Sequence, residues 1–290
     1  MNTNDPPQGS RDLRIFFEID PLAPVRVLER TLKRFPQTGK RINRYLQEGP
    51  CTCGQCKPWP KWCLLPASCF GHIVTDEMEG KESLEAIHYH MIELATLATW
   101  RYSQGIYRFH PFLLMEILQA PFAGPMPVER FHHMPQWSVY VDTPNMNWFG
   151  EALHGFWGHL AWDSIRDVET LVFLLDKGNG LEVVAVETGP WSVREGIQRI
   201  DDEAREYCLK NNISPSEPKY SAEETATALA PLVSMLLYLC SETAEIEHEH
   251  TPGLRPANPQ PKKTRHGLKM FPPAQPTFWR VGKAAGALLG

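Results

Sequence analysis

Five of the seven cysteines lie in one short segment whose spacing is suited to metal binding. Cys53 and Cys56 are separated by two residues, which is the spacing of a zinc knuckle, and thiolates are preferred ligands of zinc. The candidate ligands are Cys51, Cys53, Cys56 and Cys63, with Cys69 or His72 as replacements. A second C-x-x-C pair is missing, so two interpretations stay open: a structural zinc ion, or reduced thiols in a turn beside Trp59 and Trp62.

The remaining chemically active side chains show no arrangement typical of an enzyme. His88 and His90 are two residues apart in a predicted helix, so their side chains point to different faces. The sequence has no H-E-x-x-H metal motif, no G-x-S-x-G nucleophile turn and no glycine-rich phosphate or dinucleotide loop. Spacing therefore selects no catalytic pair, and we expect a protein that acts by binding, although a site assembled from distant residues stays open.

Aromatic side chains are concentrated in one stretch of the chain. This group contains Trp137, Tyr140, Trp148, Phe149, Phe156, Trp157 and Trp162. Successive side chains of a strand point to opposite faces of a sheet, so these rings cannot all point the same way. They either pack in the core or form an aromatic platform on an open sheet face, which would suit a peptide or stacked bases.

The secondary structure expected around these residues indicates an α+β fold. Apolar spacing favours helices over 25–46, broken at Pro36 and Gly39, and over 82–104, 111–119 and 222–246. Ser192 and Glu195 form a capping box that opens a helix extending to Lys210. Alternating residues predict strands over 137–142, 153–162, 168–175 and 181–187. We therefore expect N-terminal helices, a central antiparallel sheet of about four strands, and C-terminal helices.

Composition divides the chain into three expected regions. Residues 1–50 form a basic helical segment, residues 51–250 an α+β core domain, and residues 251–290 a basic, proline-rich tail. Seven prolines between 252 and 276 predict an extended tether. Residues 278–290 are typical of the start of a helix, so we expect the sequence to stop before the end of that segment.

Charge is segregated along the chain, although the formal net charge is only −5. Residues 25–44 carry seven Lys or Arg against one Glu, and residues 255–283 carry seven Lys or Arg and no acid. Residues 195–249 carry 12 acidic residues against four basic ones. The basic flanks are either solvated helix faces or an electrostatic footprint for RNA or an acidic partner.

No membrane segment or secretion signal is indicated. The N-terminus is polar, and the longest apolar stretch, about 226–240, is shorter than the ~20 residues that a membrane span needs. We expect a cytoplasmic protein.

Two sequence blocks resemble a known protein family. They are W-R-x-x-x-G-I-Y at residues 100–107 and P-x-W-x-V-Y-V-D at residues 135–142. Further similar segments occupy 59–66, 155–160, 232–241 and 279–282 in the same order. Over about residues 55–290, the chain resembles the second family of type V-A anti-CRISPR proteins, which are encoded on plasmids and phages.

The resemblance implies a function in the cytoplasm of a bacterial host. It implies a non-catalytic protein that limits production of the type V-A effector nuclease. Such a protein would recognise the N-terminal peptide of the effector as it leaves the ribosome, and loss of the effector's mRNA would follow. The basic flanks would then contact the ribosome or the mRNA.

The peptide-binding residues expected from the resemblance lie mostly in the two specific blocks. They are Trp100, Arg101, Tyr107, Trp137, Tyr140, Asp142 and Trp157. Arg101 and Asp142 would fix the polarity of the peptide, and the aromatic rings would supply buried area. The alternative is that these residues form a buried Trp-Arg-Asp network that defines the fold.

Two other functions stay open at this level. The basic flanks are compatible with a protein that binds or cleaves RNA directly, and the cysteines with a zinc-stabilised structural adaptor of a mobile element. Exposed aromatic residues would also permit a homodimer.

Overall fold

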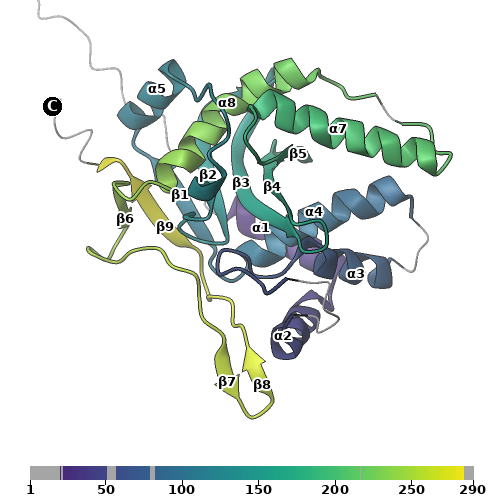
Figure 1. Cartoon of the computed structure of the whole chain (residues 1–290). Helices are drawn as coiled ribbons and strands as arrows, with labels where there is room; N and C mark the ends of the chain where they lie inside the picture. The colour runs from purple at the N-terminus through teal and green to yellow at the C-terminus, as the bar shows by residue number, and fades with distance from the viewer. Residues whose placement is uncertain (1–19, 21, 51–56, 79–81, 216, 284–290) are drawn as a thin grey trace, which may run out of the picture.

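A mixed β-sheet forms the centre of the computed structural model, which describes residues 20, 22–50, 57–78, 82–215 and 217–283 (Figure 1). Within these residues the sheet has seven strands in the order β5-β4-β3-β2-β1-β9-β6. Neighbours are antiparallel except that β1 runs parallel to both β2 and β9. A separate two-stranded hairpin, β7-β8, projects from the body near α2 (Figure 1).

The strands of the large sheet are β1 (Gly105–Phe109), β2 (Ser138–Trp148), β3 (Glu151–Asp163), β4 (Val168–Asp176), β5 (Leu181–Glu187), β6 (Ile246–His248) and β9 (Thr277–Val281). The hairpin consists of β7 (Lys262–Thr264) and β8 (Gly267–Lys269). The helices are α1 (Ala23–Arg34), α2 (Thr38–Glu48), α3 (Ala67–Glu77), α4 (Leu84–Trp100), α5 (Pro111–Gln119), α6 (Val128–Phe131), α7 (Val193–Lys210) and α8 (Ala222–Leu239).

Helices cover both faces of the sheet, because successive residues of each strand pack against helices on opposite faces. One row of neighbouring residues, namely Ile106, Tyr140, Trp157 and Leu174, packs against α1 and α4 in a fully buried cluster. The next row, namely Tyr107, Val141, Phe156 and Leu175, points to the opposite face, in the cluster that includes α8. Of the two alternatives for the aromatic residues, the described part of the sheet therefore shows core packing and no open aromatic platform.

The α+β class predicted from the sequence is confirmed. The prediction of about four antiparallel strands was too low, because the described sheet has seven strands and is mixed. The four predicted strands are β2 to β5. Sequence periodicity missed β1, β6 and β9 because they have only three to five residues each. Residues 278–281, where the expected helix was to begin, lie instead in strand β9, whose pairing partner β1 lies far away in the sequence. Residues 284–290 of the same prediction lie outside the described residues.

Helix boundaries follow the local signals closely. The first predicted helix is broken between Arg34 and Thr38, next to Pro36. The capping box of Ser192 and Glu195 is formed and starts α7, as predicted. The last core helix is shorter than expected: it ends at Leu239, and residues 246–248 form strand β6.

The proline-rich segment is bound to the body of the protein, so it is not a free tether. Asn258 Oδ1 accepts a hydrogen bond of 2.7 Å from the backbone N–H of Trp137. Further along, Met270 is buried, and its N–H donates to Asn43 Oδ1 of α2 at 2.8 Å. In the part of the chain that the structure describes, no helix is both long and apolar enough to cross a membrane.

Candidate functional site

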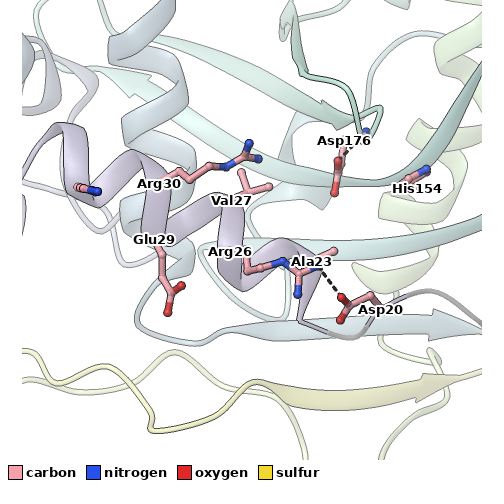
Figure 2. Close-up of a pocket in the computed structure, with 10 residues that line it drawn as sticks. Asp20, Ala23, Arg26, Val27, Glu29, Arg30, His154 and Asp176 are labelled. Carbon is pink, nitrogen blue, oxygen red and sulfur yellow. Dashed lines mark hydrogen bonds and ion pairs between the residues drawn. The ribbon is translucent and has the colours of Figure 1, made fainter.

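A pocket of about 820 Å³ lies between α1 and the end of the β-sheet where β4 turns into β5 (Figure 2). We call it the α1 pocket. Its lining residues are Asp20, Ala23, Arg26, Val27, Glu29, Arg30, Lys33, His154, Asp176 and Gly178. Helix α1 supplies most of one wall, and the ends of β3 and β4 supply the other. The volume is in the range of roughly 300–1,000 Å³ that is usual for ligand pockets.

Helix α1 is held in place by apolar burial and by one polar network. Its Val27 and Leu28 pack in the buried cluster with Trp100 and Trp157. Next to this cluster, Thr31 Oγ1 donates to the buried Glu93 of α4 at 2.6 Å. The other oxygen of Glu93 contacts the His90 ring at 2.9 Å and the Arg34 guanidinium at 3.6 Å. These contacts fix which face of α1 turns toward the pocket.

The opposite wall contains a buried carboxylate, Asp176, which is only 4% exposed. Its Oδ1 accepts the backbone N–H of Gly178 at 3.1 Å, and its Oδ2 accepts the hydroxyl of Tyr140 at 3.3 Å. Neither donor is charged. Buried carboxylates are usually paired with a cation, so a carboxylate with only neutral donors at a pocket wall can still accept a charged partner.

The hydrogen bond between Tyr140 and Asp176 depends on a glycine between them. Gly155 of β3 is the register neighbour of both Asp142 and Asp176. A Cβ atom at Gly155 would lie 2.3 Å from the Tyr140 hydroxyl and 2.7 Å from the Val141 carbonyl oxygen. Only a residue without a side chain leaves room for the Tyr140 ring to cross β3.

The α1 wall carries cations that have few partners of their own. Arg26 pairs with Asp20 at 2.5 Å at the mouth of the pocket. Arg30 and Lys33 are exposed, and within the described residues neither forms an ion pair. The α1 side of the pocket therefore carries Arg26, Arg30 and Lys33 together with the acidic Asp20 and Glu29, and the Asp176 carboxylate lies on the opposite wall (Figure 2).

Most of the aromatic residues expected at a peptide site lie inside the protein. Trp100, Tyr107, Tyr140 and Trp157 have no exposed surface. The indole N–H of Trp100 donates to Gly105 O at 2.9 Å, and the hydroxyl of Tyr107 donates to Gln136 Oε1 at 3.1 Å. These four side chains form the core on both sides of the sheet, so they do not offer a surface to a peptide in this conformation. Of the four, Tyr140 is the one whose hydroxyl forms a hydrogen bond with a residue that lines the pocket, Asp176.

The three other predicted residues do not come together. Asp142 is buried and pairs with Arg108 at 2.7 Å, whereas Arg101 points to α2, where its guanidinium lies over Gly39. Burial raises the pKa of Asp142, although its hydrogen bond with Arg108 acts in the opposite direction. Trp137 is half-buried, and its indole donates to Lys61 O at 3.0 Å. A polarity-fixing pair of Arg101 and Asp142 is therefore not formed.

The cysteine prediction falls largely outside the described residues, which do not include Cys51, Cys53 and Cys56. Cys63 is buried, and its thiol donates to Leu65 O at 3.1 Å. Burial raises the pKa of the Cys63 thiol far above its ordinary value, which disfavours the thiolate that zinc requires. Among the residues with described positions, no group of three or more His, Cys, Asp or Glu is placed to hold a metal ion.

Sequence reasoning missed the residues that line the pocket. The charges of Arg30 and Lys33 were visible, but only as part of a basic helix. Asp176 was visible only as the first residue of a hairpin turn. The contact between residues 20–33 and residues 154–178 is long-range, and no local pattern in either segment points to the other.

Comparisons with known proteins agree on one family. Residues 107–290 match the model of the AcrVA2-like family, described as the anti-CRISPR type V subtype A2 family. A solved structure, the crystal structure of AcrVA2, is similar with a TM-score of 0.63 and 17% sequence identity. The match covers 91% of this chain and 86% of that one. At this identity the structural match shows a shared fold. No curated protein matches the sequence.

Proposed function

The chain belongs to the AcrVA2-like family of type V subtype A2 anti-CRISPR proteins, and from this premise we propose that it suppresses synthesis of a type V-A effector by binding the effector's nascent N-terminal peptide. Loss of the effector's mRNA follows that binding. We place the peptide in the α1 pocket, and no catalytic step by this chain is part of the proposal.

The observation that carries this proposal is that Arg30 and Lys33, cations without an ion pair among the described residues, line one side of the pocket and the buried Asp176 carboxylate lines the other. An extended peptide offers N–H donors, carbonyl acceptors and charged side chains within a few ångströms of each other. Asp176 can accept a backbone N–H or a cationic side chain of the peptide. Arg30 and Lys33 can receive carbonyl oxygens or acidic side chains from the other side.

The buried residues of the family blocks support the pocket without touching the ligand. Trp100 and Trp157 hold α1 against the sheet through Val27 and Leu28. Tyr140 fixes the orientation of Asp176. A site whose walls are fixed in this way loses little conformational entropy when the peptide binds.

The proposal is tested by sequencing the RNA that co-purifies with the tagged protein from cells that carry a type V-A locus. We expect enrichment of the effector mRNA, and we expect it to vanish when the first codons are recoded to a different peptide. Puromycin, which releases nascent chains, should abolish the enrichment as well. Enrichment that survives puromycin or recoding would exclude recognition of the nascent peptide.

A matched pair of variants locates the site. Arg30→Glu/Lys33→Glu reverses the charge of one pocket wall, and we expect at least about a tenfold loss of enrichment, since charge-assisted hydrogen bonds contribute about 1.5–3 kcal/mol each. Lys61→Glu/Arg130→Glu makes the same change in net charge at exposed positions outside the pocket lining, and it should leave the enrichment unchanged. Equal losses in both variants would remove the pocket from the proposal.

A further inference from the structure

Two basic segments from opposite ends of the sequence meet on one surface of the protein. The hairpin β7-β8 lies next to α2 (Figure 1), and Gln47 Nε2 of α2 donates to the carbonyl oxygens of His266 and Leu268 at 3.1 and 3.0 Å. Asn43, one turn earlier on α2, receives the Met270 N–H. These contacts attach the hairpin along one row of α2.

Cations surround this contact on both elements. Lys40 and Arg44 are exposed on α2 and lie one turn apart, beside the row formed by Asn43 and Gln47. The hairpin adds Lys262, Lys263, Arg265 and Lys269. We call these six residues the basic ribbon surface. Only tertiary structure brings them together, because more than 200 residues separate α2 from the hairpin in the sequence.

The four hairpin cations lack acidic partners. Residues 250–283 contain no Asp or Glu, and in the described part of the chain none of the four forms an ion pair. Exposed cations elsewhere do pair with carboxylates, for example Arg194 with Glu223 and Lys210 with Glu206. The positive charge of the hairpin is therefore not neutralised within the described structure, although the whole chain is acidic.

The strand register of the hairpin places two of these positive charges next to each other. Lys262 lies directly opposite Lys269 in the ladder. Like charges directly opposite each other destabilise a β-pair, and a bound anion would remove that penalty. The turn depends on Gly267, which has a φ of +93° and a position where a Cβ would lie 3.0 Å from Gln47.

An exposed aromatic ring follows the ribbon. Phe271 is 52% exposed, although its neighbour Met270 is buried against the body. Cations that neutralise phosphates, combined with an exposed ring on which a base can stack, are the two components of surfaces that bind single-stranded nucleic acid. The β7-β8 hairpin is too short to fill the groove of a duplex, since each of its strands has three residues.

We propose that the basic ribbon surface binds single-stranded RNA through its phosphate backbone, with Phe271 stacking on a base. The choice of RNA rests on the proposed function, which places the protein beside a translating ribosome, where RNA is the surrounding polyanion. We expect this binding to be independent of RNA sequence, because contacts with phosphate groups carry no sequence information.

The test uses the full chain and a fluorescein-labelled single-stranded RNA of mixed sequence, titrated at several salt concentrations. The ribbon variant is Lys262→Gln/Lys263→Gln/Arg265→Gln/Lys269→Gln. We expect its Kd to rise by at least about tenfold, and the slope of log K against log salt to become shallower by about 0.7 for each phosphate that the variant no longer neutralises. Phe271→Ala should weaken binding without changing that slope, because stacking releases no counterions.

The matched control is Arg194→Gln/Arg205→Gln/Lys210→Gln/Lys219→Gln. It makes the same change in net charge, but each of these exposed cations has an acidic partner. We expect wild-type RNA affinity for this variant. Equal losses of affinity in the two quadruple variants, or wild-type binding by the ribbon variant, would overturn the proposal.

Two further arms identify the partner and separate this inference from the proposed function. Binding to anionic lipid vesicles in place of RNA would overturn it in favour of a membrane surface, and binding only to duplex DNA would overturn it as well. Puromycin-sensitive recovery of effector mRNA together with absent RNA binding in vitro would overturn this inference alone. RNA binding together with puromycin-insensitive recovery would overturn only the nascent-peptide proposal.

Discussion

The hydroxyl of Tyr140 donates a hydrogen bond of 3.3 Å to Asp176 Oδ2, crossing the strand that separates their own strands. Burial, with Asp176 nearby, raises the pKa of Tyr140 well above its ordinary value, so the phenol remains a proton donor at all physiological pH values. The hydrogen bond connects a specific family block, which contains Tyr140, to the wall of the α1 pocket. Although Tyr140 is fully buried, it thus orients a carboxylate that lines the α1 pocket.

We expect Tyr140→Phe to lower the free energy of unfolding by about 1–2 kcal/mol, since a buried acceptor on Asp176 loses one of its donors. The looser carboxylate should also weaken binding of the effector peptide several-fold. Urea unfolding and fluorescence titration with the peptide measure the two effects. The control is Tyr102→Phe, because the Tyr102 hydroxyl is buried with no hydrogen-bond partner among the described residues. Similar losses of stability for both variants would show that the Tyr140–Asp176 bond has no special role.

We expect Gly155→Ala to destabilise the protein by about 1–3 kcal/mol, because the new methyl group collides with the Tyr140 ring and the Val141 carbonyl. Gly180→Ala is the control, since a Cβ at Gly180 meets no atom within 4 Å. In combination with Tyr140→Ala, the cost of Gly155→Ala should fall, which a double-mutant cycle from thermal unfolding measures. Strict additivity would mean that the steric conflict lies elsewhere.

Acid should destabilise the protein through His159. This ring is buried, lies 2.9 Å from Trp137 O through Nδ1, and has a pKa that burial lowers to about 4. Because the folded state binds a proton more weakly than the unfolded state, stability is complete above pH ~6.5 and falls as the pH drops toward 4. The expected loss of stability over this range is about 3 kcal/mol.

Denaturant unfolding at several pH values tests this prediction. His159→Asn keeps a donor for Trp137 O and removes the titrating group, so its stability should decline less between pH 6.5 and 4. A wild-type profile that matches the variant's profile would assign acid sensitivity to the carboxylates instead.

Any zinc bound by the chain should not depend on Cys63. Its thiol donates to Leu65 O, and burial disfavours the thiolate. We expect Cys63→Ala to leave the zinc content of purified protein unchanged, as measured by elemental analysis without exposure to chelators. Cys53→Ser/Cys56→Ser is the comparison, since these two residues carry the zinc-knuckle spacing. Loss of zinc from the Cys63→Ala variant would show that Cys63 is a zinc ligand after all.

The sequence by itself determined the elements whose signals are local. Periodicity located the four long strands β2 to β5, and the capping box of Ser192 and Glu195 located the start of α7. The sequence blocks that resemble the family also indicated the family that the family model matches over residues 107–290. Within these blocks, Trp100, Tyr107, Tyr140 and Trp157 are fully buried. Because these side chains are buried, they do not lie at the protein surface in this structure.

Tertiary structure alone decided the positions of the sites. Strands β1 and β9 are short, and their parallel pairing requires partners about 170 residues apart, so no local pattern could predict it. The α1 pocket depends on contact between α1 and Asp176, and the basic ribbon surface on contact between α2 and the β7-β8 hairpin. The sequence gives the order of the side chains, whereas a site depends on the distances between them. Those distances are set on folding by contacts between segments that are far apart in the sequence.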